Sequence, residues 1–163
     1  MKLEPTEYYG SWSGARIANF LEQARMPLRV SLNTNSGLLI VPIWSEFRAG
    51  RFSSCSPKRS WLVKSLRENP EVAFDLSTNE IPYRGLRGRG IARCSDVADA
   101  QALENLLQRF TGGTANTLAE SLLSRANEEA IIEIEITWLT SWDFSESMER
   151  IEKIGSRLPG APL

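Results

Sequence analysis

Alternation of apolar and polar residues divides much of the chain into short strands. The segment 28–34, LRVSLNT, alternates regularly, and after an Asn-Ser-Gly turn the segment 38–44, LLIVPIW, is almost wholly apolar. Two such runs joined by a short turn are typical of a β-hairpin. Pro42 supplies no N–H group to a ladder, so it predicts an edge position, a bulge or a ligand beside this strand.

Further strands are predicted near Phe52, over 71–77, over 85–95 and over 132–138. In the last of these, IEIEITW, residues two apart share a face of the strand. One face would therefore carry Ile132, Ile134, Ile136 and Trp138, and the other Glu133, Glu135 and Thr137. The glycines within 85–95 would permit a bend or the close approach of a ligand.

Apolar residues three and four apart predict helices between these strands. Ser13 can cap a helix over 14–25, and a short helix that follows a basic loop ends at Asn69-Pro70. Asp96 can cap a third helix, and a fourth is predicted over about 117–125. About six strands with peripheral helices indicate a mainly β protein built as a barrel.

The length of 163 residues fits a single domain. Within 1–163 we expect an N-terminal helical segment over 1–26, a barrel with inserted helices over 27–145, and a charged tail over 146–163 that ends in a disordered RLPGAPL. No apolar run approaches the ~20 residues that span a bilayer. The first residues lack the apolar core of a secretory signal, so we expect a cytoplasmic protein with no membrane partner.

The chain contains no histidine. This excludes Ser-His-Asp and Cys-His catalysis, histidine-ligated haem and most catalytic zinc sites. The acidic residues show no recognisable ligand spacing, so no metal site is predicted. The only cysteines, Cys55 and Cys94, form no CxxC motif and are expected to be free thiols.

Positive charge is concentrated in two stretches, although the net charge is −1. No acidic residue lies within 48–67 or within 81–93. Such segregation in a nearly neutral chain favours a local anion over a long polyanion, and a pI near 5.7 argues against a nucleic-acid partner. The basic residues concerned are Arg48, Arg51, Lys58, Arg59, Lys64, Arg67, Arg84, Arg87, Arg89 and Arg93.

The loop and helix start over 53–64 combine serines with basic side chains. The N–H groups and the positive dipole end of a helix N-terminus can hold a phosphate, but a solvated helix with a capping serine explains the same residues. Trp142 is a candidate to cover a flat ring, although tryptophans more often pack in a core. Cys55 also fits the role of a small residue at a strand end.

The order of these features resembles the pyridoxamine 5'-phosphate oxidase-like family of FMN-binding split barrels. The resemblance rests on PLRVSLNTNSGLLIVPIWSEFRAGRF, on the helix followed by NPEVAFDL, and on PYRGLRGRGIA, within about 26–96. It extends more faintly to IIEIEITWLTSWDFS. It implies a six-stranded antiparallel split β-barrel and a homodimer with the flavin in the groove between the protomers.

The resemblance also implies a set of cofactor-binding residues. The flavin ring would lie along Val41, Pro42, Ile43 and Trp44, with Pro42 interrupting the ladder, and Arg84 would contact the cofactor. Trp142, the candidate named above to cover a flat ring, is added to this set from its position in the sequence alone. The phosphate would meet the loop and helix start over 54–64. The candidate residues there are Ser54, Cys55, Ser56, Lys58, Arg59, Ser60 and Lys64.

The chain departs from the strict oxidase at several positions. The oxidase has Ser-Arg-Lys at the helix start, where this chain has Ser60-Trp61-Leu62, so Lys58, Arg59 and Lys64 are the candidates to replace the missing ligands. The substrate-binding histidine of the oxidase has no counterpart. Pyridoxamine phosphate oxidation is therefore not expected.

We expect an FMN-dependent oxidoreductase that acts on a small-molecule substrate, with no side chain assigned as acid or base. One alternative is a deazaflavin-dependent reductase, whose longer acidic cofactor would suit the arginines over 84–93. A non-catalytic flavin-binding or sensing module is another, and FAD is an alternative cofactor. A nucleic-acid-binding barrel would be indicated only by salt-sensitive binding to single strands.

Overall fold

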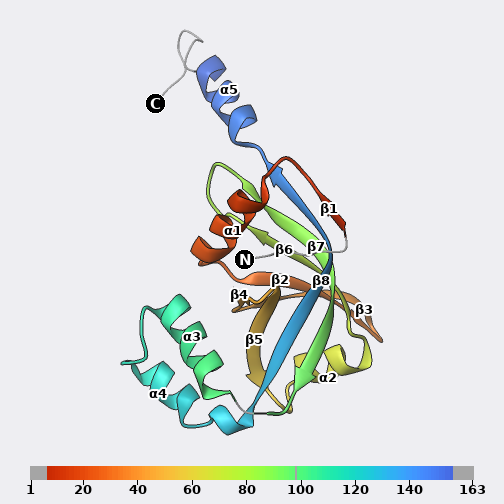
Figure 1. The fold of residues 1–163 in the computed structure, drawn as a ribbon, viewed down its shortest axis with the longest axis vertical. Coiled ribbons are helices and arrows are strands. Elements are labelled where there is room, and N and C mark those ends of the chain that lie inside the picture. Colours follow the sequence, from red (N-terminus) through yellow and green to blue (C-terminus); the bar gives the residue numbers. More distant parts are fainter. Residues whose placement is uncertain (1–6, 98, 156–163) are drawn as a thin grey trace.

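One eight-stranded sheet forms the body of the computed structural model, which describes residues 7–97 and 99–155 (Figure 1). Its hydrogen-bonded order is β3-β2-β6-β7-β8-β5-β4, and β1 pairs with β8 beside this path. The strands are β1 (Glu7–Tyr9), β2 (Leu28–Thr34), β3 (Gly37–Ile43), β4 (Glu46–Arg48), β5 (Arg51–Pro57), β6 (Glu71–Ser77), β7 (Arg84–Ser95) and β8 (Glu129–Asp143).

Six of these strands correspond to the predicted ones, so the mainly β barrel with peripheral helices is confirmed. The count differs, because β1 and β4 are three-residue strands that the sequence pattern does not predict. The pair formed by β1 and β8 is parallel, whereas the other pairs are antiparallel.

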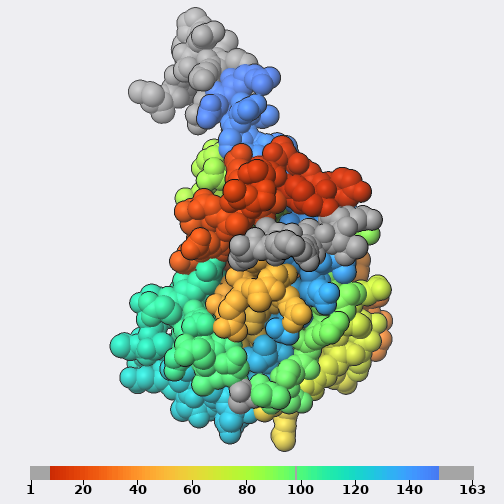
Figure 2. Space-filling model, in the orientation of Figure 1, coloured from red at the N-terminus to blue at the C-terminus, as the bar shows by residue number. Residues whose placement is uncertain are grey.

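The helices lie around the sheet, with α2 beside the β2–β3 hairpin and α5 extending from the opposite end of the molecule (Figure 1). α1 and α3 flank β4 and β5, as the space-filling view shows (Figure 2). The helices are α1 (Gly14–Gln23), α2 (Trp61–Glu68), α3 (Ala100–Thr111), α4 (Thr117–Leu123), a 3-10 turn η1 (Ala126–Glu128) and α5 (Ser145–Gly155). None of the described helices is long and apolar enough to cross a membrane.

Capping side chains explain where four of these helices begin. Ser13, Ser60 and Asn116 each accept a hydrogen bond from the N–H group three residues on, as N-cap residues do. The prediction of Asp96 as the third cap is wrong, since Asp99 caps α3. Asp96 instead pairs with Arg67 at 2.6 Å. The predicted disorder over 157–163 lies outside the described residues.

The core is built from alternate positions of the strands. Leu28, Val30 and Leu32 of β2 are fully or almost fully buried, while the residues between them are not. β3 pairs with β2 along its whole length, which confirms the predicted hairpin. Burial of this alternating apolar face is the main stabilising contribution to a sheet of this kind.

A bulge changes which face the end of β8 presents. Trp138 pairs with Arg89, but Ile136 pairs with the next residue, Gly90, so Thr137 is an extra residue in β8. Before the bulge, alternate residues such as Ile136 are buried; after it, the buried residues are Leu139 and Ser141. The prediction that Trp138 shares a face with Ile136 is therefore wrong, because the extra residue reverses the alternation.

Two glycines of β7 allow close packing inside the barrel. A Cβ atom on Gly88 would lie 2.4 Å from the ring of Phe74, and one on Gly90 would lie 2.5 Å from the carbonyl oxygen of Glu135. Any larger residue would collide at both places. In the described structure, the absence of a side chain at these glycines therefore lets neighbouring protein groups approach closely.

Candidate functional site

The hydroxyl groups of Ser56 and Ser60 meet at the N-terminus of α2. Their Oγ atoms are 3.0 Å apart, and Ser60 Oγ accepts from the N–H group of Val63 at 3.2 Å. The first turn of α2 contains no acidic residue. Its leading N–H groups lack acceptors within the helix, so this end can hold an anion.

Lys58 and Arg59 precede this helix, but their surroundings differ. The ammonium group of Lys58 donates to the carbonyl oxygen of Asn127 at 2.6 Å. Arg59 is exposed, and within the described residues its guanidinium group has no hydrogen-bond or ion-pair partner. Both line a pocket of about 390 Å³ together with Pro57, Asn127 and Glu128. Arg59 is thus the more accessible cation for an anion at this end of α2.

Lys64 faces a second pocket. This pocket, called here the hairpin–α2 pocket, measures about 420 Å³ and lies between the turn of the β2–β3 hairpin and one face of α2. Lys64 Nζ is 4.0 Å from a carboxylate oxygen of Glu68, and its side chain is 74% exposed. The three basic residues predicted to bind the phosphate are therefore divided between two pockets, with Lys58 and Arg59 in one and Lys64 in the other.

Ser54 and Cys55 point to opposite sides of β5. Ser54 is buried, and its Oγ has no hydrogen-bond partner among the described residues. Cys55 packs against the small apolar cluster formed by α3 and α4. Burial, reinforced by nearby carboxylates, raises the pKa of the Cys55 thiol to about 12. The structure does not bring Cys55 to the hydroxyl cluster at α2, and its thiol is protonated at neutral pH.

The predicted ring-binding segment lies at the edge of the sheet. Of the three explanations predicted for Pro42, an edge position, a bulge or a nearby ligand, the structure agrees with the edge position. β3 pairs only with β2 among the described strands, and the register runs through Pro42 without a shift. The predicted interruption of this ladder does not occur, because the proline lies on an edge strand. Val41 is half-buried and Ile43 is buried. Trp44 is half-buried, and one face of its ring stacks on Phe110 of α3 with the ring centroids 5.3 Å apart.

Arg84 and Trp142 lie at the other end of β8 from the hydroxyl cluster. Arg84 pairs with Asp143, whereas Ser56 pairs with Ala130. These two β8 positions are 13 residues apart, which at a rise of about 3.3 Å per residue spans roughly 40 Å along the strand. Within one chain, Arg84 and Trp142 therefore form a second group, separate from the hydroxyl cluster at α2.

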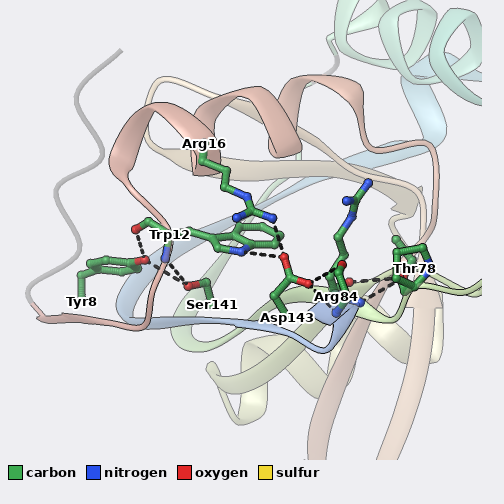
Figure 3. Close-up of polar contacts among 9 residues, drawn as sticks. Tyr8, Trp12, Arg16, Thr78, Arg84, Ser141 and Asp143 are labelled. Atoms are coloured by element: carbon green, nitrogen blue, oxygen red, sulfur yellow. Dashed lines mark hydrogen bonds and ion pairs between the residues drawn. The ribbon is translucent and has the colours of Figure 1, made fainter. Parts of the chain in front are cut away.

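A polar cluster surrounds the second group, and sequence reasoning does not predict it (Figure 3). The carboxylate of Asp143 accepts hydrogen bonds from the indole of Trp12 at 3.2 Å, from the Ser145 hydroxyl at 2.6 Å and from Arg16. Arg84 is held nearby by its N–H group, which donates to Thr78 Oγ1 at 3.1 Å. The sequence YYGSW could have indicated this cluster, because a tryptophan just before a helix suggests that the N-terminal segment packs on the barrel.

The same cluster fixes the N-terminal segment on β8. Ser141 Oγ accepts from the N–H group of Trp12 at 3.1 Å, and the Tyr8 hydroxyl donates to the carbonyl oxygen of Trp12. Trp12 is 3% exposed. The segment 8–16 is thereby held beside the start of β7, where Arg84 lies.

Most of the charge in the first basic stretch is neutralised by acids from elsewhere in the chain. Arg51 pairs with Glu133 at 3.4 Å and Arg67 with Asp96. Arg48 also lies 3.7 Å from Glu46. In the second stretch, Arg93 pairs with Glu135 at 3.3 Å and Arg89 lies over the ring of Trp138. Within these two stretches, the cations without an acidic partner among the described residues are Lys58, Arg59, Arg84, Arg87 and Arg89.

No family model and no curated protein matches the sequence. Among solved structures, the chain is similar to a conserved hypothetical protein of Mycobacterium tuberculosis, with 19% identity and a TM-score of 0.71 over 94% of this chain and 92% of that one. It is also similar to an F420 reductase, with 16% identity and a TM-score of 0.60 over 73% and 92%.

A third similar structure is a candidate pyridoxamine 5'-phosphate oxidase of Listeria innocua. The identity is 13% and the TM-score 0.57, over 80% of this chain and 97% of that one. At such identities the likeness concerns the arrangement of the chain. The protein therefore has the fold of the pyridoxamine 5'-phosphate oxidase-like split barrels, as the sequence resemblance predicts.

Proposed function

We propose that the protein binds a flavin-type cofactor, FMN, and acts as an oxidoreductase on a small-molecule substrate. The observation that carries this proposal is the meeting of the Ser56 and Ser60 hydroxyls at the start of α2, in a first turn that contains no acidic residue. The fold supports it, because solved proteins of this fold include an F420 reductase. F420 is a deazaflavin, so flavin-type chemistry is compatible with this architecture.

The residues present at this site fit a phosphate. The Ser56 and Ser60 hydroxyls can donate to phosphate oxygens, and the N–H groups of the first turn of α2 add donors with a favourable dipole. Arg59 would supply a charge-assisted bond. When bound, the cofactor would supply the electron or hydride transfer, and the protein would bind and orient it. No described side chain is assigned as acid or base.

The proposal includes a homodimer with the cofactor in the groove between the protomers. One chain holds Ser56 and Arg84 at positions roughly 40 Å apart along β8, which is too far for one flavin to reach both. A second copy could bring its own Arg84 to the first copy's α2. The exposed apolar residues of β3, Leu38 and Ile40, support a partner on this side of the sheet.

A deazaflavin is the second candidate cofactor, because Arg84 and Arg87 have no acidic partner among the described residues and could meet a longer acidic tail. The mass and absorption spectrum of the molecule that co-purifies with the protein distinguish the two cofactors. Turnover with a reduced nicotinamide distinguishes an oxidoreductase from a non-catalytic flavin-binding module.

The phosphate site is tested by comparing FMN with riboflavin, which lacks the phosphate. Arg59→Ala should weaken FMN binding roughly 10- to 150-fold, the equivalent of one charge-assisted contact, and leave riboflavin binding nearly unchanged. Lys58→Ala is the matched control and should have a smaller effect, because Lys58 is already bound to the Asn127 carbonyl. If Arg59→Ala weakens the binding of FMN and of riboflavin equally, the phosphate binds elsewhere. If the wild-type protein binds no flavin at all, the proposed function is refuted.

A further inference from the structure

We propose that Glu129 is a pH-sensitive switch, whose ionisation loosens the packing of α3, α4 and η1 against β5. These three elements, called here the helical insert, lie between β7 and β8 in the chain and beside β5 in space (Figure 1). Glu129 is the residue at which the chain leaves the insert and enters β8. The inference goes beyond the proposed function, because it concerns the packing of the insert and needs no flavin.

Three glutamates of β8 share one face of the strand, and only the buried one lacks a partner. Glu133 and Glu135 each form an ion pair with an arginine, and their side chains are about half exposed. Glu129 is 8% exposed, and its carboxylate forms no hydrogen bond or ion pair with another described residue. Its ladder partner is Pro57, which carries no charge. A carboxylate is seldom buried in this way without a partner, because its desolvation is costly.

The helical insert covers the face on which Glu129 lies. Pro57 pairs with Glu129 and Cys55 pairs with Ile131, so the thiol and the carboxyl group lie on the same side of the sheet. On that side Cys55 packs against the apolar cluster formed by α3 and α4, and α3 also contacts η1. If the insert moves away from β5, both groups become accessible to water.

Few apolar contacts hold the insert in place. Its cluster contains three buried residues, Leu103, Leu107 and Ala119, whereas the core cluster of the barrel is far larger. Elements with few buried apolar contacts open locally at a lower free energy than core strands. An unpaired charge beneath the insert therefore acts on local opening before it acts on unfolding of the barrel.

The charged groups around Glu129 do not neutralise it. Burial raises the pKa of Glu129, the charge of Arg125 opposes this effect and that of Glu128 adds to it, and the pKa lies above its ordinary value. Arg125 is exposed and donates to the carbonyl oxygen of Ser121. The titratable groups of the surrounding elements are Cys55 on β5, Lys58 and Arg59 after it, Asp99 at the cap of α3, and Arg125 and Glu128 before β8.

The sign of the pH effect follows from this raised pKa. Below the ordinary glutamate value of about 4.3 the carboxyl group is neutral whether the insert is closed or open, and closure has no electrostatic cost. As the pH rises from there to the pKa of the closed state, ionisation increasingly favours the open state, in which the carboxylate is hydrated. The insert should therefore open more readily at neutral pH than in acid.

Opening of the insert would also change the pocket of Lys58 and Arg59. Lys58 donates through its backbone N–H group to the carbonyl oxygen of Glu128 at 2.8 Å, and through its ammonium group to that of Asn127 at 2.6 Å. Both carbonyl groups belong to residues that line this pocket. The switch would thereby make one wall of the pocket depend on pH.

The test is hydrogen exchange of the full-length protein without ligand, measured by mass spectrometry between about pH 4 and pH 7.5. Wild type and Glu129→Gln are compared at each pH, so that the intrinsic pH dependence of exchange cancels. Near pH 4, α3 and α4 should exchange alike in the two proteins. As the pH rises they should exchange faster in the wild type, by up to about tenfold per pH unit, because one proton is linked to opening.

Three further variants serve as controls. Glu129→Met, a second neutral variant, should behave like Glu129→Gln. Glu129→Asp keeps a carboxyl group and should keep the pH dependence. Glu133→Gln removes a half-exposed, ion-paired glutamate of the same face and should leave the pH dependence of α3 and α4 unchanged.

The Cys55 thiol gives an independent measure of the same opening. In a Cys94→Ser protein Cys55 is the only thiol, and at pH 7.5 it should react with a maleimide faster than in the same protein carrying Glu129→Gln.

The inference is refuted if the exchange of α3 and α4 in wild type and Glu129→Gln keeps one ratio at every pH. Equal changes in the slowest amides of β7 would refute it too, since Glu129 would then act on the whole molecule. Faster exchange in Glu129→Gln at neutral pH would mean that the carboxylate stabilises the closed insert. None of these measurements involves a flavin, so the switch and the proposed function can fail separately.

Discussion

Among single residues, Asp143 joins three parts of the chain. Its carboxylate accepts from Trp12 and Arg16 of the N-terminal segment and from Ser145 at the start of α5 (Figure 3). Burial raises the pKa of Asp143, but the hydrogen bonds from Ser145 and Trp12 and the charge of Arg16 outweigh burial, and the pKa lies below its ordinary value. The ionised carboxylate therefore contributes to stability.

Asp143→Asn should lower the free energy of unfolding by about 1.5–3 kcal/mol at pH 7, because the charged acceptor is lost and donors are left without a partner. Urea unfolding measures this loss. Since the folded pKa is depressed, the contribution of Asp143 is complete above the ordinary aspartate value of about 4 and is lost as the pH falls through the folded pKa. The difference between wild type and variant should therefore shrink in acid.

Glu133→Gln is the control for this prediction. Glu133 forms an ion pair with Arg51 in which both side chains are nearly half-exposed, so its loss should change stability by less than about 1 kcal/mol. An Asp143→Asn protein as stable as wild type at pH 7 would show that the cluster does not hold the N-terminal segment in place.

Among the elements, β8 depends on one extra residue. Thr137 forms the bulge opposite Arg89 and Gly90, and it allows Leu139 to enter the core although Ile136 is also buried. A one-residue change of register turns every following side chain to the other face of a strand. The bulge therefore decides which residues of 138–143 face the core and which face outward.

Deletion of Thr137 should destabilise the protein by more than about 3 kcal/mol, because Leu139 and Ser141 would turn outward and Trp138 and Thr140 inward. Thr137→Ala, which keeps the residue count, should cost less than about 1 kcal/mol. Denaturant unfolding and soluble yield compare the two variants. A deletion variant as stable as Thr137→Ala would mean that the bulge can move along the strand without cost.

In the whole molecule, β3 is an apolar strand that the other described residues leave largely exposed. Leu38 is 79% exposed and Ile40 66%, and the strand contains no charged residue to protect its open edge. Exposed, apolar, uncharged edges are usually covered by another chain or element. The proposed homodimer would cover this surface.

The double variant Leu38→Lys, Ile40→Lys should therefore sediment as a monomer, whereas the wild-type protein should sediment as a dimer. Ile81→Lys is the matched control, since Ile81 is 64% exposed in the loop before β7, and this variant should remain dimeric. Analytical ultracentrifugation measures all three. A wild-type monomer that still binds flavin would contradict the proposed dimer.

The sequence by itself determined the elements that depend on local patterns. The hairpin of 28–44 and the strand over 71–77 follow from alternation, and α2 follows from its capping serine and the Asn-Pro that ends it. These signals lie within a few residues of the structure they predict. The resemblance of their order also sufficed to identify the split-barrel fold.

Only the tertiary structure decided which residues of β8 face the core and which basic residues have acidic partners. It also decided that the candidate site residues lie in separate places. The bulge at Thr137 is a property of the pairing between β7 and β8, and the regular alternation of IEIEITW gives no sign of it. Arg51 and Arg67 look unpaired in sequence because Glu133 and Asp96 are brought to them by strand pairing and by the path of β7. Ser56 and Arg84 are 28 positions apart in the chain but lie at opposite ends of one long strand, because register, which depends on contacts between distant segments, places them there.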